Sequence, residues 1–406
     1  MTFGGTTMKK MTKLLSLVLA VMMLAAYAVG CAPKASEEKT EAAEPETIVS
    51  EDTAAGSEEE ETTDENGTHT VTDGKGNEVE VPNKIERVAI ISSMPLASVY
   101  CMVAGDNQKI VGLTAASKNA AVNSFLTRIV DDLDEISTDF SKDGSVNVEE
   151  VLLLEPDVVF YNTNNASDCE AVEKLKNMGI ACVGFSTTIG DNNTVGTFQA
   201  WVKLLGEVLG ESLQADAIVK YGEDVQKMVA GKVAALSEEE RKSAIILSNY
   251  VNNTITCAGS TFGRYWLGAI GAENPSTGLE TPTAEVNLEQ LYQWDPEVIF
   301  LNSFSAYTAE DILNNTAGEG QDWSGITAVK NGEVYKMPLG MYYWFPPCSD
   351  SPLALQWLAK NLYPELFSDL DMDAVICDYY SEFYGIELTE EDLNTLYNPP
   401  AESAWQ

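Results

Sequence analysis

Histidine is almost absent from this chain of 406 residues, which contains only His69. A metal site built from several imidazoles and a HExxH protease site are therefore excluded. Basic residues are also scarce, because 24 Lys and Arg stand against 63 Asp and Glu, which gives a net charge of -39. Such an acidic surface repels phosphate backbones, so the composition argues against nucleic-acid binding.

The common enzyme motifs are absent as well. The sequence contains no CxxC pair, no GxxxxGK[ST], no GxGxxG and no GxSxG, so the usual redox, nucleotide and acyl-transfer sites have no signature here. We expect no enzymatic activity. Six cysteines follow Cys31, but none is close to another in the sequence, and we predict no disulfide.

The N-terminus carries an export signal. Three lysines precede an unbroken apolar run over residues 14–30, which is short for a membrane span and is typical of a secretory signal, predicted here over residues 1–30. The run ends at Gly30-Cys31 and resembles a bacterial lipoprotein signal, in which the cysteine is acylated. Ordinary cleavage after Ala28 is the alternative interpretation.

An acidic segment separates the signal from the rest of the chain. Residues 32–67 contain 13 acidic residues, two lysines and no aromatic residue. Such a composition buries too little apolar surface to offset its ordering entropy. We predict a disordered tether over residues 31–68, which would link a lipid-anchored Cys31 to a folded body. An acidic solubilising tail is the alternative.

A repeat organises the body of the chain. Residues 146–162 (VNVEEVLLLEPDVVFYN) match residues 286–302 (VNLEQLYQWDPEVIFLN), with seven of 17 positions identical. In each copy an asparagine can cap a short helix, a proline ends it, and an apolar strand follows. A helix followed at once by a buried strand is typical of α/β layers.

The repeat predicts two lobes of the same plan. We expect an N-terminal α/β lobe over residues 69–190 and a C-terminal α/β lobe over residues 241–406. Residues 191–240 have helical periodicity and no strand signal, so they predict a connecting helix. The expected fold class is α/β, with two Rossmann-like lobes joined by a single long helix.

With its predicted tether and two lobes of the same plan, the chain resembles the solute-binding lipoproteins of ABC importers that carry ferric siderophores, haem and cobalamin. The resemblance covers roughly residues 69–398 and rests on five segments: the opening at Val71–Asp73, the two repeat copies, residues 328–335 and residues 352–367. It implies a class III periplasmic-binding-protein fold. It also implies an extracytoplasmic, lipid-anchored monomer that works with an ABC permease and its ATPase. Such a protein binds a small metal chelate as its cargo and has no resident cofactor or metal.

The resemblance assigns a role to one glutamate in each lobe. In this family a glutamate near a helix N-terminus of each lobe meets arginines of the permease. The matching residues are Glu149 and Glu289, each seven residues before its proline. The alternative is that both only complement the helix dipole, and neighbouring Glu150 and Gln290 leave the assignment open by one position.

A ligand is expected beyond the carboxyl ends of the strands, where the two lobes face each other. Residues just past the predicted strands include Asn249, Thr261, Asn302 and Phe304. An aromatic run, Tyr342-Tyr343-Trp344-Phe345, follows the last strand and offers flat amphipathic faces. The ligand-binding residues predicted from these positions are Ser93, Lys118, Tyr161, Tyr250, Phe262, Arg264, Tyr342, Tyr343 and Trp344.

The charge of these segments limits the ligand. Of the four arginines in the body only Arg264 falls on a predicted cleft segment, whereas an anionic catecholate complex usually meets several cations. A near-neutral or amphipathic ferric siderophore therefore fits best, delivered by the protein to its permease. Haem held by tyrosine and a corrinoid are alternatives within the class. A carboxylate-based metal-ion receptor and an extracellular enzyme on a similar fold are the more remote ones.

Overall fold

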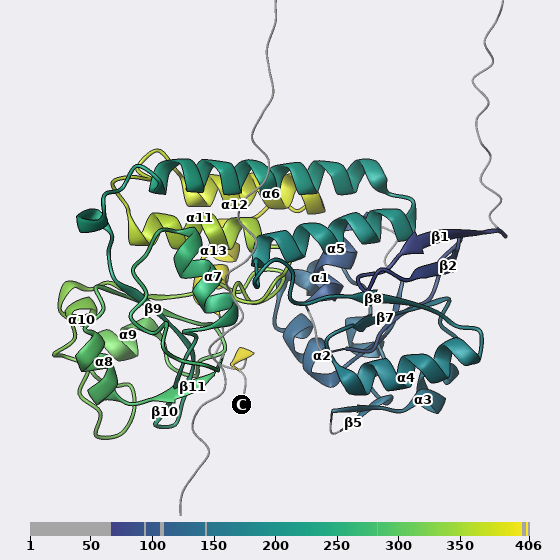
Figure 1. The fold of residues 1–406 in the computed structure, drawn as a ribbon, viewed down its shortest axis with the longest axis horizontal. Coiled ribbons are helices and arrows are strands. Elements are labelled where there is room, and N and C mark those ends of the chain that lie inside the picture. Colours follow the sequence, from purple (N-terminus) through teal and green to yellow (C-terminus); the bar gives the residue numbers. More distant parts are fainter. Residues whose placement is uncertain are drawn as a thin grey trace, which may run out of the picture. The chain divides into compact units, whose positions relative to one another are not determined.

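The computed structural model describes residues 66–92, 95–105, 109–142, 144–281, 283–399 and 403–404 (Figure 1). All of them belong to the compact unit that spans Glu61–Gln406. The predicted signal peptide and Cys31 lie outside the described residues, as do all but the last three residues of the predicted tether. The first element is a hairpin formed by β1 (Thr68–Thr72) and β2 (Glu78–Pro82).

A parallel sheet of four strands forms the N-terminal lobe. Its strands are buried along most of their length because they carry Val, Ile, Phe and Ala in near-continuous runs, as a sheet covered on both faces requires. The strand order is β4 (Ile110–Leu113), β3 (Val88–Ile90), β7 (Val158–Asn162), β8 (Ala181–Phe185). The helices of this lobe are α1 (Leu96–Ala104), α2 (Ala115–Val122), α3 (Val148–Leu153) and α4 (Ala166–Asn177).

The C-terminal lobe contains a mixed sheet of five strands. Three of them are parallel: β9 (Ala244–Val251), β12 (Val298–Leu301) and β13 (Val334–Lys336). Beside β9 the sheet continues with β10 (Thr254–Cys257), which is antiparallel to β9, and then with the edge strand β11 (Ala284–Val286), which is antiparallel to β10. The helices here are α7 (Thr261–Ala269), α8 (Leu288–Trp294), α9 (Ala309–Leu313) and α10 (Thr327–Asn331).

The repeat copies form equivalent helix–strand units, as the sequence predicts. Asn147 caps α3, its Oδ1 accepting from the backbone N–H of Glu149 at 3.0 Å, and β7 follows. Asn287 caps α8, its Oδ1 accepting from the backbone N–H of Gln290 at 2.9 Å, and β12 follows. β7 and β12 each lie inside their sheet, so the two lobes share one plan.

The connection between the lobes consists of two helices, α5 (Thr194–Leu209) and α6 (Ser212–Val233). They are separated at Gly210, whose φ of 74° is the left-handed conformation that ends many helices. The long helix α6 crosses above both lobes in Figure 1.

Three further helices follow the C-terminal sheet: α11 (Ser351–Leu362), α12 (Met372–Tyr384) and α13 (Glu390–Tyr397). α11 packs along α6 (Figure 1), and its Trp357 also contacts the rings of Phe300 in β12 and Tyr335 in β13. α12 reaches α1, where the Tyr384 hydroxyl donates to the backbone carbonyl of Ser98 at 3.3 Å. The chain passes between the lobes through the α5–α6 connection, in agreement with the predicted fold class, and the C-terminal helices add packing contacts between the lobes.

None of the helices in the described part of the chain combines the length and the apolar character that a bilayer crossing needs. The short elements are β5 (Ser141–Lys142), β6 (Ser145–Val146) and 3₁₀ turns at Phe125–Arg128, Leu133–Glu135 and Glu238–Glu240.

Candidate ligand-binding cleft

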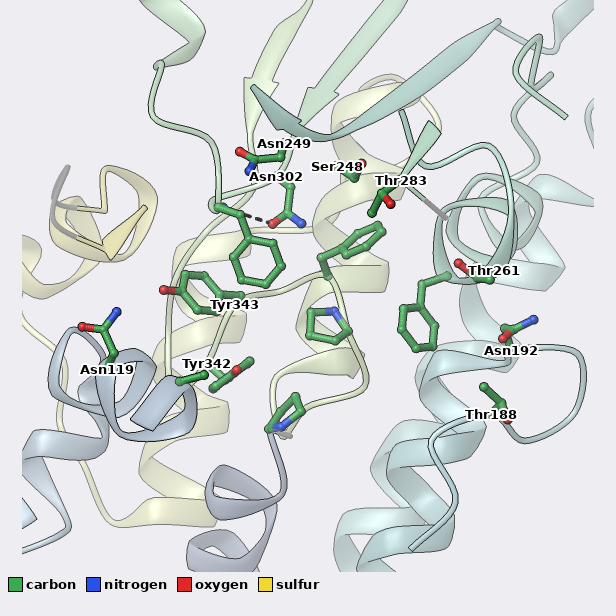
Figure 2. Close-up of a pocket in the computed structure, with 16 residues that line it drawn as sticks. Asn119, Thr188, Asn192, Ser248, Asn249, Thr261, Thr283, Asn302, Tyr342 and Tyr343 are labelled. Carbon is green, nitrogen blue, oxygen red and sulfur yellow. Dashed lines mark hydrogen bonds between the residues drawn. The ribbon is translucent and has the colours of Figure 1, made fainter. Parts of the chain in front are cut away.

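A cavity of about 490 Å³ lies between the two lobes (Figure 2). Pro95, α2 and the loop before α5 contribute its N-terminal wall. The ends of β9 and β12, the start of α7 and the loop between β13 and α11 contribute the C-terminal wall. The described residues that line it are Pro95, Ala116, Asn119, Thr188, Asn192, Ser248, Asn249, Thr261, Phe262, Thr283, Asn302, Phe304, Tyr342, Tyr343, Phe345 and Pro346.

The lining is uncharged. Its polar members carry hydroxyl or carboxamide groups, and none of the lining residues that the structure describes is Asp, Glu, Lys, Arg or His. Phe262, Phe304, Tyr342, Tyr343 and Phe345 form what we call the aromatic wall. Such a surface recognises ligands by flat apolar contact and neutral hydrogen bonds rather than by charge.

The aromatic wall is held by its own ring contacts. The rings of Phe304 and Tyr343 meet edge-to-face with centroids 4.3 Å apart, and those of Tyr342 and Tyr343 meet in the same way at 5.1 Å. The Tyr343 hydroxyl donates to the backbone carbonyl of Ser403, and burial raises the pKa of Tyr343 to about 12. These rings are therefore fixed before a ligand arrives, which lowers the entropic cost of binding.

A buried carboxylate anchors the loop that carries three of these aromatics. Oδ2 of Asp350 accepts from the Met341 backbone N–H at 2.8 Å, the Trp344 indole at 2.9 Å and the Tyr380 hydroxyl at 3.0 Å. Asp350 is completely buried, and this burial raises its pKa to about 6 against the opposing effect of these donors. Gly340 is required here, because a Cβ at this position would lie 2.3 Å from the same carboxylate oxygen.

An ion pair joins the two lobes beside the cavity. Arg264 of α7 lies 3.0 Å from the Asp191 carboxylate in the loop before α5, next to the lining residues Asn192 and Phe262. The two side chains are 51% and 82% exposed, so the pair contributes about 1 kcal/mol at most to stability. Arg264 is therefore near the cavity, as expected, but it is outside the lining and already paired.

The structure brings three of the predicted ligand-binding residues together: Phe262, Tyr342 and Tyr343 all line the cavity. Ser93 lies outside the described residues. The other four predicted positions, apart from Arg264, are outside the lining, and their placement in the cleft is corrected here: Lys118, Tyr161, Tyr250 and Trp344.

Each of these four side chains points elsewhere for a physical reason. The Lys118 ammonium donates to the carbonyls of Asp134 and Ile136 at 2.7 and 2.8 Å. Tyr161 alternates with Phe160 along β7, and so it faces the core under α4. Tyr250 is buried against the rings of Tyr307 and Trp323.

Trp344 is fully buried, and its indole N–H donates to the carboxylate of Asp350.

Several lining residues were not among the predicted site residues. Asn249 lies near the end of β9, and Thr261, Asn302 and Phe304 follow strands, so their positions contained the signal; Phe345 belongs to the aromatic run. Asn119, Thr188 and Thr283 had no comparable signal, because α2 and the loops that carry them approach the cleft only through tertiary packing.

The two predicted docking glutamates occupy equivalent places. Glu149 and Glu289 are exposed in the first turns of α3 and α8, one on each lobe (Figure 1). Neither belongs to the cavity lining.

His69 is not part of the cavity lining. Its ring nitrogens contact Asn83 Oδ1 at 2.8 Å and the Glu207 carbonyl at 3.0 Å. The described residues also contain no group of three or more His, Cys, Asp or Glu side chains placed to hold a metal ion, and the six cysteines there are free thiols.

The chain is similar to known binding proteins over most of its length. The chain is 26% identical over 333 residues to the molybdate-binding protein MolA of Haemophilus influenzae, covering 77% of this chain and 90% of that protein. It is 24% identical to an uncharacterised ABC transporter substrate-binding lipoprotein, YvrC of Bacillus subtilis, over 74% and 87% of the two chains. A solved periplasmic solute binding protein from Veillonella parvula superposes with a TM-score of 0.74 at 30% identity, covering 82% and 97%.

The family model for periplasmic binding proteins matches residues 88–339, which include both sheets. The named relatives are ABC substrate-binding proteins rather than enzymes. These matches agree with the two α/β lobes of the structure. The chain belongs to the periplasmic binding protein family and is an extracytoplasmic substrate-binding protein of an ABC transporter.

Proposed function

We propose that the cleft binds a bulky, near-neutral metal chelate, specifically a ferric siderophore, and presents it to the permease. The observation that carries this proposal is the uncharged aromatic and amide lining of a cavity of about 490 Å³. A chelate arrives with its metal already satisfied, so it needs no carboxylate, thiolate or imidazole from the protein. It needs shape, apolar surface and neutral hydrogen bonds, which this lining supplies.

Haem is a less suitable ligand for this cleft. Tyrosine ligation of haem iron requires a phenolate, but burial raises the pKa of both Tyr342 and Tyr343, and the Tyr343 hydroxyl is engaged with Ser403. Molybdate is the second candidate, because a relative that is similar over 77% of the chain is a molybdate-binding protein. A tetrahedral oxyanion would fill only a small part of this cavity.

Replacement of Tyr342 by alanine tests the ligand contact. We expect it to weaken binding of the preferred ferric chelate by about one to two decades, since one buried aromatic face contributes about 1–3 kcal/mol. Tyr292→Ala is the matched control, because Tyr292 is an exposed tyrosine of α8 outside the lining. Isothermal titration of wild type and both variants measures the three affinities.

The wild-type protein is titrated with ferric hydroxamate, citrate and catecholate complexes, haem, a corrinoid, molybdate and free Fe³⁺, Mn²⁺ and Zn²⁺. Tightest binding of a ferric siderophore supports the proposal. If molybdate or a free metal ion binds more tightly than every chelate, or if Tyr342→Ala changes no affinity, the proposal is wrong.

We also propose that the mature protein is attached to the membrane through an acylated Cys31. The apolar run that ends at Gly30-Cys31 and the acidic segment behind it support this proposal, and relatives are named as lipoproteins. We expect Cys31→Ser to move the protein from the membrane fraction to the soluble fraction and to abolish fatty-acid labelling. Unchanged membrane retention in this variant would contradict the anchor.

A further inference from the structure

Two carboxamide side chains of the C-terminal wall have hydrogen-bonding atoms that the protein leaves unused. Asn302 follows β12 and Asn249 lies near the end of β9, the neighbouring parallel strand. Both line the cavity, and Figure 2 shows them beside each other at its wall. Nδ2 of Asn302 and Oδ1 of Asn249 are buried, and neither has a hydrogen-bond partner among the described residues.

The orientation of the Asn302 amide is fixed by its other end. Its Oδ1 accepts from the Phe304 backbone N–H and from the Ser303 hydroxyl, each at 3.4 Å. Its Nδ2 is therefore the end that is left to meet a ligand. Asn302 is fully buried, and its backbone N–H donates to the Leu247 carbonyl at 2.9 Å, which ties it to β9.

A buried polar atom without a partner costs free energy, because it has lost its hydrogen bond to water and gained none from the protein. Of six such side-chain atoms among the described residues, these two belong to the cavity lining. One is a donor and the other an acceptor. An oxyanion would be repelled by the unpaired oxygen of Asn249, and a cation would be repelled by the amide hydrogens of Asn302. The complementary group is neutral and carries both an N–H and a C=O.

We propose that Asn249 and Asn302 form a subsite for a carboxamide group of the ligand. The ligand carbonyl accepts from Asn302 Nδ2, and the ligand N–H donates to Asn249 Oδ1. This inference rests on the proposed function and narrows it to chelates that bear amide groups beside their metal-binding groups. The aromatic wall then contacts the apolar part of the same ligand.

The main test compares Asn302→Asp with Asn302→Ala. Asn302→Asp keeps an oxygen for Phe304 and Ser303 but replaces the donor by a charged acceptor in an apolar cavity. We expect affinity for an amide-bearing ferric hydroxamate to fall about a hundredfold in Asn302→Asp and about tenfold in Asn302→Ala. An analogue in which esters replace the amides keeps the carbonyl that meets Asn302 and lacks the N–H that meets Asn249. We therefore expect Asn249→Ala to weaken binding of the amide-bearing chelate about tenfold and to leave the affinity for the ester analogue at the wild-type level. A purely structural role for Asn302 predicts the opposite order, with Asn302→Asp the milder change.

A small probe tests the subsite without any chelate. In the full chain, side-chain amide NMR signals of Asn249 and Asn302 are followed during titration with acetamide, and separately with N,N-dimethylacetamide, which lacks the N–H. We expect a saturable shift of both signals with acetamide and a weaker one with its dimethyl analogue. Equal responses to both probes, or none, would overturn the subsite. If acetamide binds as expected while no chelate does, the subsite stands and the siderophore proposal fails.

Discussion

Uptake of the ligand through the permease is expected to stop when Glu149 and Glu289 are both replaced by alanine, while ligand affinity remains at the wild-type level. The two carboxylates are exposed at matching positions of α3 and α8, outside the cavity lining. We propose that they bind cationic side chains of the permease, one from each lobe. Loss of both removes the charged contacts that orient the protein on its transporter.

The fold should tolerate this double change. An acidic residue in a first helical turn contributes about 0.3–1 kcal/mol through the helix dipole, and both helices keep their asparagine caps. Transport of a labelled ferric chelate into cells and titration calorimetry of the purified protein measure the two properties separately.

The adjacent pair provides the matched control. Glu150→Ala with Gln290→Ala changes the next residue on each helix, and these side chains are half-buried. We expect this control to transport at nearly the wild-type rate. If Glu149→Ala with Glu289→Ala also transports normally, the two glutamates only complement their helix dipoles; if the control pair alone stops uptake, docking is shifted by one residue.

The architecture was predictable because its signals are local. A capping asparagine, a proline stop and a buried apolar run lie within 17 residues of sequence, and they fix α3 with β7 and α8 with β12. The antiparallel strand β10 was missed. In the structure Asn252, with a φ of 47°, forms the tight turn before it, but a turn and four residues of strand do not reveal in the sequence that β10 folds back on β9.

The cleft was only partly predictable, because position in sequence does not set side-chain direction outside regular elements. Tyr342, Tyr343 and Trp344 are consecutive, yet the first two line the cavity and the third points to Asp350. That choice depends on a carboxylate six residues further along the chain and on Tyr380 of α12. Along β7, by contrast, strand alternation placed Phe160 and Tyr161 on opposite faces, and this signal could have removed Tyr161 from the predicted site.

Replacement of Asp350 by asparagine is expected to change how stability depends on pH. Burial raises the pKa of this carboxyl from 3.8 to about 6, so the folded state holds its proton more tightly than the unfolded state. Between these two values the folded state binds more protons, and its stability falls as pH rises. Asparagine imitates the protonated form and avoids this loss.

The ionisable groups that interact with Asp350 do not compensate its charge. They are Tyr379, Tyr380 and Tyr384 of α12 and Cys348 of its own loop, and burial raises the pKa of each. All four therefore remain neutral where Asp350 titrates. The difference between a pKa of 3.8 in the unfolded state and about 6 in the folded state corresponds to roughly 3 kcal/mol. We therefore expect the free energy of unfolding of Asp350→Asn to gain roughly 3 kcal/mol on that of the wild type between about pH 4 and pH 7.

Urea unfolding of wild type and Asp350→Asn at about pH 4, 5, 6 and 7 measures this difference, and the other carboxylates cancel because both proteins share them. The same exchange at exposed Asp216 of α6 is the control for replacing Asp by Asn. We expect the free energy of unfolding of Asp350→Asn to gain on that of the wild type as pH rises, mostly below about pH 6. If the difference in unfolding free energy between the two proteins stays constant over this range, the pKa of Asp350 is the same in the folded and unfolded states. Its three hydrogen-bond donors would then fully offset the effect of its burial, and the prediction would be wrong.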